Sequence, residues 1–429
     1  MSKIRSIHSI QIVDSRGAPS ISCKVTLEND LSYISMVPSG ASTGSREALE
    51  LRDGGADFMG KGVQNALKNI NSIIAPKLIG LDVNEQENID HVMLDLDGSS
   101  DKSSLGANAI LGVSLGALGA GALNKGIPLF QHINDVFTDV NKVQPTMRLP
   151  VPMLNIINGG EHADNNIDIQ EFMIMPIGAQ SLQQAMQWST EIYATLKILL
   201  HEKGLSTGVG DEGGFAPNLK STAEAIELII RSIEKRNLIP GQDVGIALDC
   251  AATEFYENGV YTLKGENKIL DSSEFADYLA ALVSQYPIVS IEDGMDESDF
   301  TGWKILTERI GKKCQLVGDD LFVTNVKELQ RGVDDELGNS ILIKFNQIGT
   351  ITETLQTIHL ANSQAFTSVI SHRSGETEDT VIADLAVGLG TGQIKTGAPC
   401  RSDRVAKYNR LLWIEAENPN LEFTKNVFG

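Results

Sequence analysis

The chain has 429 residues and a formal net charge of −21 at pH 7, with 41% apolar and 21% charged residues. This length is more than one small core needs, and it suits a barrel together with a further domain. The acidic balance argues against a nucleic-acid or anionic-membrane surface, because such surfaces are built from clustered lysine and arginine. The four cysteines are scattered without a CxxC pair, which is typical of a reducing compartment. Since the start, MSKIRSIHSI, lacks the apolar segment of a signal peptide, we expect a cytoplasmic protein.

The first part of the chain predicts a small α+β domain. Residues 4–37 hold three apolar segments separated by the turns SRG and ND, which indicates an antiparallel three-stranded meander. A Gly/Ser/Thr-rich loop at 37–45 follows, and helical patterns then cover about 61–79, 84–95 and 106–125. The segment 134–152 has three prolines and little periodicity. We therefore divide the chain into an N-terminal domain, 1–137, and a larger domain, 138–429.

One segment, residues 103–124, is long and uncharged and contains a GxxxG pattern at Gly112 and Gly116. Such a segment is either a membrane span or a helix buried inside the protein. Serine, asparagine and repeated glycine dilute its hydrophobicity, and helix glycines permit close packing at a cost of about 1 kcal/mol each. We therefore expect a buried helix and no membrane span.

The second domain opens irregularly. Two apolar segments, MLNIING and IDIQEFMIMP, are joined by the polar loop 158–168, which is too short for a helix. Helical patterns at about 180–203 and 221–236 then flank the loop 206–218. The predicted order is β-β-α-α before regular β/α units begin at Val244, and six further units bring the strands to eight. We expect an atypical TIM-like (β/α)8 barrel whose second strand runs antiparallel to the rest, because strands joined as a hairpin must oppose each other.

Six charged residues close successive apolar, β-branched segments in the far half of the chain. These segments are typical of buried parallel strands. The charged residues are Asp249, Glu292, Asp319, Lys344, His372 and Lys395. Because the active site of a (β/α) barrel lies at the carboxyl ends of its strands, we expect these side chains to gather at one rim. Three carboxylates and two lysines at one rim indicate a metal-assisted reaction on an anionic substrate.

The three acidic residues of this set are candidate metal ligands. Asp249, Glu292 and Asp319 are hard oxygen donors with no cysteine in a ligand pattern, which favours Mg²⁺, or Mn²⁺ in its place, over Zn²⁺. Three carboxylates also leave positions open for water and substrate. The alternative is that each carboxylate caps a helix or pairs with a lysine, which is the better interpretation of one such residue alone but not of three.

The basic residues have two interpretations each. Lys344 and Lys395 would act as bases only when neutral, and neighbouring cations would lower their pKa, whereas the alternative is a salt bridge to the metal carboxylates. Arg373 and Ser374 follow the next-to-last predicted strand, where barrels of this kind often bind phosphate, and arginine offers a bidentate fork to it.

Two glutamates and two histidines complete the candidates. Glu171 and Glu212 could share a proton, so that one carboxyl stays protonated near neutral pH and serves as an acid. Glu212 lies in the glycine-rich GDEGGF, where a glutamate is otherwise a turn residue. His162 and His372 are either ligands in the pocket or hydrogen-bonded structural side chains.

Several long motifs resemble one family. SGASTGSREALELRD, GGEHADNNIDIQEFMI, GVGDEGGFAPN, SIEDGMDESD, LVGDDLFVTN, ILIKFNQIGT, VISHRSGETEDT and GQIKTGAPCRSDR are similar to the motifs of enolases, the phosphopyruvate hydratases of glycolysis. The resemblance extends from about Ile4 to Arg410, and HADNNIDIQEF and GDDLFVTN place it closer to the bacterial branch. It implies the reversible dehydration of 2-phospho-D-glycerate to phosphoenolpyruvate with two Mg²⁺ ions. It also implies a barrel that begins β-β-α-α, in agreement with the predicted order.

The resemblance assigns a role to each candidate. Asp249, Glu292 and Asp319 would hold the first metal ion, and Ser42 the second. Lys344 would remove the C2 proton, and Glu212, paired with Glu171, would protonate the leaving C3 hydroxyl. The residues that would bind substrate are His162, Gln170, Glu171, His372, Arg373, Ser374 and Lys395.

Other functions remain open at this stage. A relative that abstracts a proton from a substrate without phosphate would share the three carboxylates, but it would not be expected to keep SGAST, GDEGGF and HRSGE together. A non-catalytic scaffold for RNA-decay machinery, or a surface protein that binds host proteins, would need neither Lys344 nor Glu212. The family forms homodimers and, in some bacteria, octamers, and the sequence does not choose between them.

Overall fold

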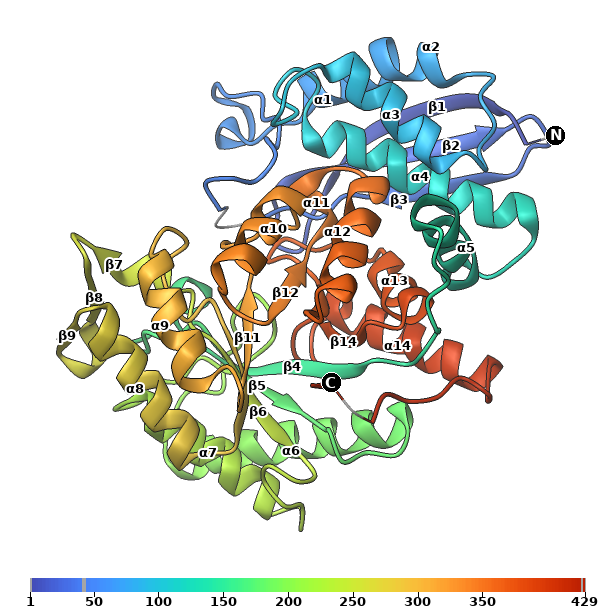
Figure 1. The fold of residues 1–429 in the computed structure, drawn as a ribbon. Helices are drawn as coiled ribbons and strands as arrows, with labels where there is room; N and C mark the ends of the chain where they lie inside the picture. Colours follow the sequence, from blue (N-terminus) through green and yellow to red (C-terminus); the bar gives the residue numbers. More distant parts are fainter. Residues whose placement is uncertain (1, 41–43, 426, 429) are drawn as a thin grey trace.

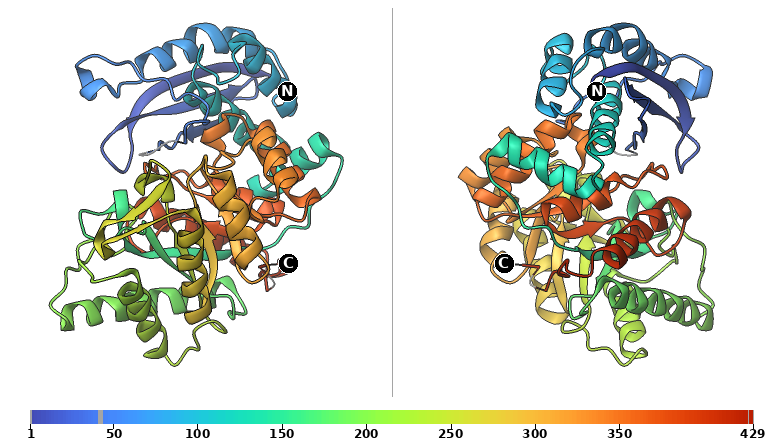
Figure 2. Two further views of the ribbon diagram at one scale, coloured as in Figure 1. Left: turned by 60° about the vertical axis from the view of Figure 1, so that its left-hand side comes forward. Right: turned by 90° about the vertical axis from the view of Figure 1, so that its right-hand side faces the viewer.

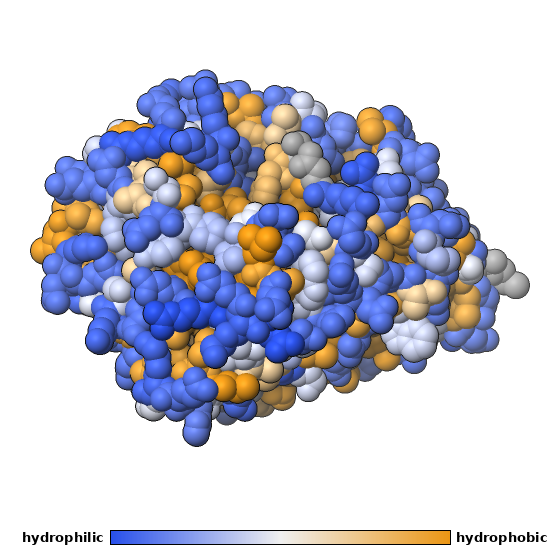
Figure 3. All heavy atoms as spheres, turned by 90° about the horizontal axis from the view of Figure 1, so that it is seen from below, coloured by the Kyte–Doolittle hydropathy of each residue, from blue (hydrophilic) through white to orange (hydrophobic). Residues whose placement is uncertain are grey.

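A computed structural model describes residues 2–40, 44–425 and 427–428. An N-terminal layer of three strands and several helices lies above a closed barrel of eight strands (Figures 1 and 2). The apolar side chains pack inside these two layers. Seen from below, hydrophilic residues cover much of the surface and hydrophobic residues are interspersed among them (Figure 3).

The N-terminal sheet is the antiparallel meander that the sequence predicts. Its strands are β1 (Ile4–Val13), β2 (Pro19–Leu27) and β3 (Ser32–Met36), in the order β1-β2-β3. The helical pattern at 61–79 forms α1 (Gln64–Asn69), a π-helical turn (Ile70–Ile74) and α2 (Ala75–Leu78). Pro76 at the start of α2 explains the widened turn, because proline lacks an N–H and clashes with the carbonyl one turn earlier. The next helix is α3 (Gln86–Asp97).

The uncharged segment forms α4 (Ala107–Lys125), which packs against β2 and β3. Among the described residues this is the one helix long and apolar enough to cross a membrane, but 89% of the relevant window is buried inside the protein. The prediction of a buried helix is therefore confirmed. Two of its glycines allow the helix to pack closely against the sheet. A Cβ on Gly119 would lie 2.3 Å from Tyr33 Cδ1, and one on Gly116 would lie 2.7 Å from Val25 Cγ2.

We predict that Gly119→Ala lowers the free energy of unfolding by about 1–3 kcal/mol, because the added methyl group overlaps the Tyr33 ring. The matched control is Gly112→Ala in the same helix, where the nearest atoms would lie 3.4 Å away. Alanine there should be neutral or should stabilise by up to about 1 kcal/mol through helix propensity. Urea unfolding measures both variants. Equal stability of the two would contradict this account of the glycines.

Helix α5 (Leu129–Asn141) was not predicted, and it extends into the segment that we had treated as irregular from residue 134. Phe130, Ile133 and Phe137 recur at helical spacing on its buried face, which packs against α13 (Val381–Leu389). Residues 137 and 138 lie inside this helix, and the division of the chain between them stays a prediction.

The barrel closes in the order β10-β11-β12-β13-β14-β4-β5-β6. Its strands are β4 (Val151–Asn158), β5 (Glu171–Met175), β6 (Gly245–Asp249), β10 (Ile288–Glu292), β11 (Gln315–Gly318), β12 (Ser340–Ile343), β13 (Thr367–Ser371) and β14 (Gly392–Lys395). β5 is antiparallel to both of its neighbours, and the other barrel pairs are parallel. The predicted β-β-α-α opening and the reversed second strand are both confirmed.

Helices surround the barrel in the predicted alternation. They are α6 (Leu182–Glu202), α7 (Thr222–Glu234), α8 (Ser272–Gln285), α9 (Phe300–Ile310), α10 (Val326–Asp335), α11 (Phe345–Ile348), α12 (Ile351–Ser363), α13 and α14 (Ser402–Glu417). One insertion was not predicted. Between β6 and α8 the chain forms a small antiparallel sheet of β7 (Tyr256–Glu257), β8 (Val260–Leu263) and β9 (Lys268–Leu270), at the edge of the molecule (Figure 1). Because of this sheet, the chain between Asp249 and Glu292 is longer than one helix and one strand require.

Candidate active site

The charged residues that close the strands do meet at one end of the barrel. Asp249, Glu292 and Lys395 are the last residues of β6, β10 and β14. Asp319, Lys344 and His372 directly follow β11, β12 and β13. All the predicted site residues lie in or against one pocket, apart from Ser42, which falls outside the described residues.

Strand register brings the acidic residues side by side. Asp249 is opposite Glu171 in the antiparallel β5–β6 pair and opposite Glu292 in the parallel β6–β10 pair. All three residues are buried, with at most 5% of their surface exposed. Three carboxylates from adjacent strands therefore lie in one buried layer.

Both lysines pair with these carboxylates. Lys395 Nζ lies 2.9 Å from Asp249 Oδ2 and from Glu292 Oε2, and 3.3 Å from Glu171 Oε2. Lys344 Nζ donates a short hydrogen bond to Asp319 Oδ2. The salt bridges that the sequence left open as an alternative are therefore present in this structure.

These pairs set the protonation of the site. Although burial lowers the pKa of Lys344, Asp319 raises it above the usual lysine value. Burial also lowers the pKa of Lys395, but Asp249, Glu171 and Glu292 together raise it well above the usual lysine value. In this arrangement Asp319 outweighs both burial and the neighbouring cations, and the lowering of the Lys344 pKa that we expect beside a divalent metal ion stays a prediction.

The acidic cluster fits a hard divalent cation. Burial, followed by repulsion from Asp249, raises the pKa of Glu292 well above its usual value. Glu292 Oε1 is buried and has no hydrogen-bond partner among the described residues. A buried carboxylate oxygen without a partner, on a strand whose neighbour ends in Asp249, suits Mg²⁺ or Mn²⁺.

A second acidic group was missed by sequence reasoning. Oxygen atoms of Asp293, Asp319 and Asp320 lie within 4.8 Å of one another. Asp293 accepts hydrogen bonds from the backbone N–H of Asp319 at 2.9 Å and of Asp320 at 3.0 Å, so it braces the turn after β11. The doubled acids in SIEDG and LVGDDL were the available signal. Of this group, Asp319 also belongs to the set that surrounds the lysines.

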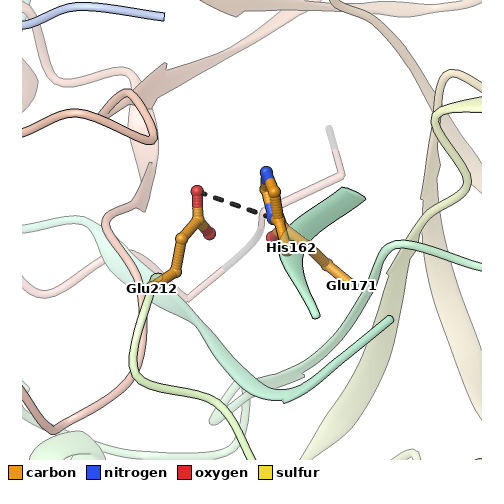
Figure 4. A group of neighbouring side chains, drawn as sticks. All are labelled: His162, Glu171 and Glu212. Atoms are coloured by element: carbon orange, nitrogen blue, oxygen red, sulfur yellow. Dashed lines mark ion pairs between the residues drawn. The ribbon is translucent and has the colours of Figure 1, made fainter. Parts of the chain in front are cut away.

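A third group joins His162, Glu171 and Glu212, whose side chains point toward one another (Figure 4). His162 lies at the end of a 3-10 turn (Gly160–His162), and its Nδ1 is 3.5 Å from Glu171 Oε1 and 3.9 Å from Glu212 Oε1. On the other side of Glu212, His372 Nε2 is 3.3 Å from Oε2. Glu212 therefore lies between two imidazoles.

The two glutamates differ in protonation. Burial and the neighbouring Glu212 raise the pKa of Glu171 well above its usual value. For Glu212, burial also raises the pKa, but His372 and His162 outweigh it and hold the pKa well below the usual value. Between these two carboxyl groups, the surroundings therefore favour a proton on Glu171 over one on Glu212.

Glycines let the Glu212 loop approach the barrel. Gly213 has a φ of 87°, which favours glycine, and a Cβ on Gly214 would lie 2.4 Å from Asn158 Oδ1. Asn155 Nδ2, from β4, donates to Glu212 Oε2 at 3.2 Å. The loop thus presents a fully buried glutamate against the ends of β4 and β5.

Arg373, which the sequence predicts to bind phosphate, pairs with a further residue that the sequence analysis did not identify, Glu47. Arg373 Nη1 is 3.1 Å and 3.0 Å from the two carboxylate oxygens of Glu47, in the loop before α1. Ser39 and Gly375 form a β-bridge that ties the same loop to the segment after β13. Gln170 also lines the pocket, and its Oε1 is buried without a hydrogen-bond partner among the described residues. The pocket therefore offers polar atoms from both layers of the molecule.

Comparison with protein families agrees with this geometry. The model described as "Enolase, N-terminal domain" matches residues 4–133, and the one described as "Enolase, C-terminal TIM barrel domain" matches residues 146–423. The two matches cover nearly the whole chain and confirm the resemblance drawn from the motifs. Enolases use a divalent metal ion, and the buried acidic groups at the rim are compatible with one. The chain therefore belongs to the enolase family of phosphopyruvate hydratases, lyases that dehydrate 2-phosphoglycerate.

Proposed function

We propose that the rim residues carry out the reversible dehydration of 2-phospho-D-glycerate to phosphoenolpyruvate by stepwise acid–base chemistry. The observation that supports this most strongly is the meeting of Asp249, Glu292 and Asp319 with Lys344 and Lys395 in one buried pocket. The three carboxylates would hold one Mg²⁺ and Ser42 would contribute to a second. When bound, the ions stabilise negative charge that develops on the substrate carboxylate.

Lys344 is the proposed base for the C2 proton. Burial lowers the pKa of Lys344, but Asp319, with Glu292, raises it above its usual value. If Asp319 held a metal ion, it would no longer pair with Lys344, and desolvation would then favour the neutral amine of Lys344. If Asp249 and Glu292 also held the ion, Lys395 would be free to contact the substrate carboxylate.

Glu212 is the proposed acid for the C3 hydroxyl, with Glu171 as its proton-sharing partner. The support is their placement with His162 in one buried group that lines the pocket. A carboxyl group is needed there because hydroxide is a poor leaving group unless it is protonated. Because the present surroundings favour a proton on Glu171 over one on Glu212, we propose that the proton passes to Glu212 when substrate enters.

The remaining candidates are proposed to orient the substrate. Arg373 and Ser374 would bind the phosphate, and Arg373 must then leave Glu47, with which it pairs here. His162, Gln170 and His372 line the same pocket and would contact the polar groups of the substrate.

We predict that Glu212→Gln separates the two halves of the reaction. Exchange of the C2 proton should fall by less than about tenfold, because Lys344 is intact, whereas dehydration should fall by about 10²–10⁴-fold for loss of the acid. Exchange is followed by NMR in deuterium oxide and dehydration by phosphoenolpyruvate absorbance. Equal losses in both would count against Glu212 as the acid.

The function itself is tested by mixing the purified protein with 2-phosphoglycerate and Mg²⁺ and recording phosphoenolpyruvate absorbance. We expect turnover that stops on chelation and returns when Mg²⁺ is added in excess. Phosphate-free 2-hydroxy acids should not react. Turnover of those acids, or none with 2-phosphoglycerate, would point to a different activity.

We also propose a cytoplasmic homodimer or higher homo-oligomer. The outer face of the N-terminal sheet supports an interface, since Ile10, Val13 and Ile34 are 53%, 60% and 51% exposed. Sedimentation of wild type and of an Ile10→Lys/Ile34→Lys double variant tests this. A monomeric wild type would contradict the proposal.

A further inference from the structure

Arg404, in the first turn of α14, is fully buried although it carries a charge. It does not line the pocket, and nothing in the proposed reaction uses it directly. Burying a guanidinium is costly unless it is paired and hydrogen-bonded. Its contacts therefore indicate what it does.

These contacts converge on the two catalytic loops. Nη1 donates to Arg373 O at 2.5 Å, and Nη2 donates to Ser374 O at 2.8 Å and to Asp211 O at 3.4 Å. Asp403 Oδ2 balances the charge at 2.9 Å from Nε. One side chain thus joins the backbone of the segment after β13 to the residue just before Glu212.

Arg404 also contacts the ring of His372. Nη1 lies 2.6 Å from His372 Nδ1. A guanidinium has donors and no acceptor, so Nδ1 must accept with its lone pair. A neutral imidazole then carries its proton on Nε2, and that atom is 3.3 Å from Glu212 Oε2. The ring therefore presents an N–H, and not a lone pair, to Glu212.

The neutral form of the ring has independent support. Burial, opposed by Glu212 and reinforced by Arg404, lowers the pKa of His372 to about 4. A neutral imidazole has two tautomers, and the hydrogen bond at one nitrogen selects between them. Here the hydrogen bond at Nδ1 comes from Arg404, whose guanidinium stays protonated and can only donate.

We propose that Arg404 is a positioning residue for Glu212, which it controls by fixing the Nε2–H tautomer of His372 and by holding the two loops together. The inference rests on the proposed role of Glu212 as the acid. With Arg404 in place, Glu212 faces a hydrogen-bond donor. Without it, His372 can turn a lone pair toward the carboxylate, and the two loops lose their common anchor.

The first test observes the wild-type protein directly and leaves Arg404 unchanged. Histidine labelled with ¹⁵N, with the His372 signals assigned by comparison with His372→Gln, reports which ring nitrogen carries the proton. We expect an unprotonated Nδ1 and a protonated Nε2 at neutral pH. An Nδ1–H tautomer or an imidazolium would overturn the proposal.

The second test compares Arg404→Met and Arg404→Lys with Arg410→Met. Arg410 is the matched control, because it lies on the same helix and pairs with Asp384 away from the pocket. We expect Arg404→Met to lower dehydration by about 10²-fold and C2 exchange by less than about tenfold, in line with a weakened acid. Arg404→Lys keeps a donor and should recover part of the loss, and Arg410→Met should leave the ratio of the two rates unchanged.

Loss of stability alone does not imitate this result, because it lowers the amount of active protein and reduces both rates equally. The proposal would be overturned if Arg404→Lys lowered dehydration and C2 exchange by the same factor. It would also be overturned if Arg410→Met changed the ratio of these two rates, even if Arg404→Met fails to fold. A wild-type protein that exchanges the C2 proton and dehydrates normally, but shows the wrong His372 tautomer, refutes the role of Arg404 alone. A wild-type protein that does neither refutes the proposed function, whatever the tautomer.

Discussion

Lys344→Ala is expected to lower both C2 proton exchange and dehydration by about 10⁴-fold, the upper range for loss of a positioned base. Lys344 directly follows β12, and its amine donates to Asp319, which follows the neighbouring strand β11. Exchange is measured by NMR of 2-phosphoglycerate in deuterium oxide, which isolates the base from the acid step.

Metal affinity should survive this substitution. Removing Lys344 takes a cation away from Asp319, so binding of Mn²⁺ should be unchanged or tighter, as measured by calorimetry. The matched control is Lys304→Ala, which removes an exposed lysine paired with Glu336 at 3.3 Å and should alter neither rate. Retained C2 exchange in Lys344→Ala would remove this residue from the role of base.

Glu292→Gln should weaken Mg²⁺ binding and, at the same time, stabilise the metal-free protein. Mg²⁺ affinity should fall by at least about 10²-fold, since even residues that only support metal ligands typically contribute 10- to 100-fold. Activity at limiting Mg²⁺ should fall with it. The metal-free protein should become more stable, because burial and Asp249 oppose the charge on Glu292, while Lys395 keeps Asp249 and Glu171 as partners.

Calorimetric titration with Mg²⁺ and urea unfolding in chelator measure the two effects separately. Glu308→Gln, at an exposed position on α9, is the control and should change neither quantity. Unchanged Mg²⁺ affinity in Glu292→Gln would show that the carboxylate at the end of β10 is not a ligand. A less stable metal-free variant would show that its charge is favourable without metal.

The strand ends could be predicted because they follow from local patterns. An apolar, β-branched segment that stops at a charge places Asp249 or Lys395 at the carboxyl edge of the sheet without knowledge of any partner. The reversed β5 could be predicted as well, since the connection from β4 is too short to return the chain to the other end.

Pairings between distant parts of the chain could not be predicted in this way. Glu47 and Arg373 are separated by 326 positions, and no periodicity near either residue indicates the other. Arg404 looks like an ordinary helix residue in the sequence, because its role depends on the carbonyl groups that the fold brings to it. Ser42 lies outside the described residues, so its metal role stays a prediction.

The small sheet of β7, β8 and β9 and the helix α5 were missed for a different reason. Strands of two to four residues are too short to produce a periodic signal. In α5 the apolar residues do recur at helical spacing, but prolines follow within a few residues, and such segments are typical of linkers between domains. In both cases the sequence pattern of the element is weaker than the patterns on either side of it.

Locating Mn²⁺ by anomalous X-ray scattering from crystals grown with the ion is the most direct test of the rim as a metal-dependent acid–base site. We predict one peak bound by oxygen atoms of Asp249, Glu292 and Asp319, with Lys344 and Lys395 displaced from the salt bridges that they form here. A peak confined to Asp293 and Asp320, or lysines that keep their carboxylates while the ion binds elsewhere, would contradict the account.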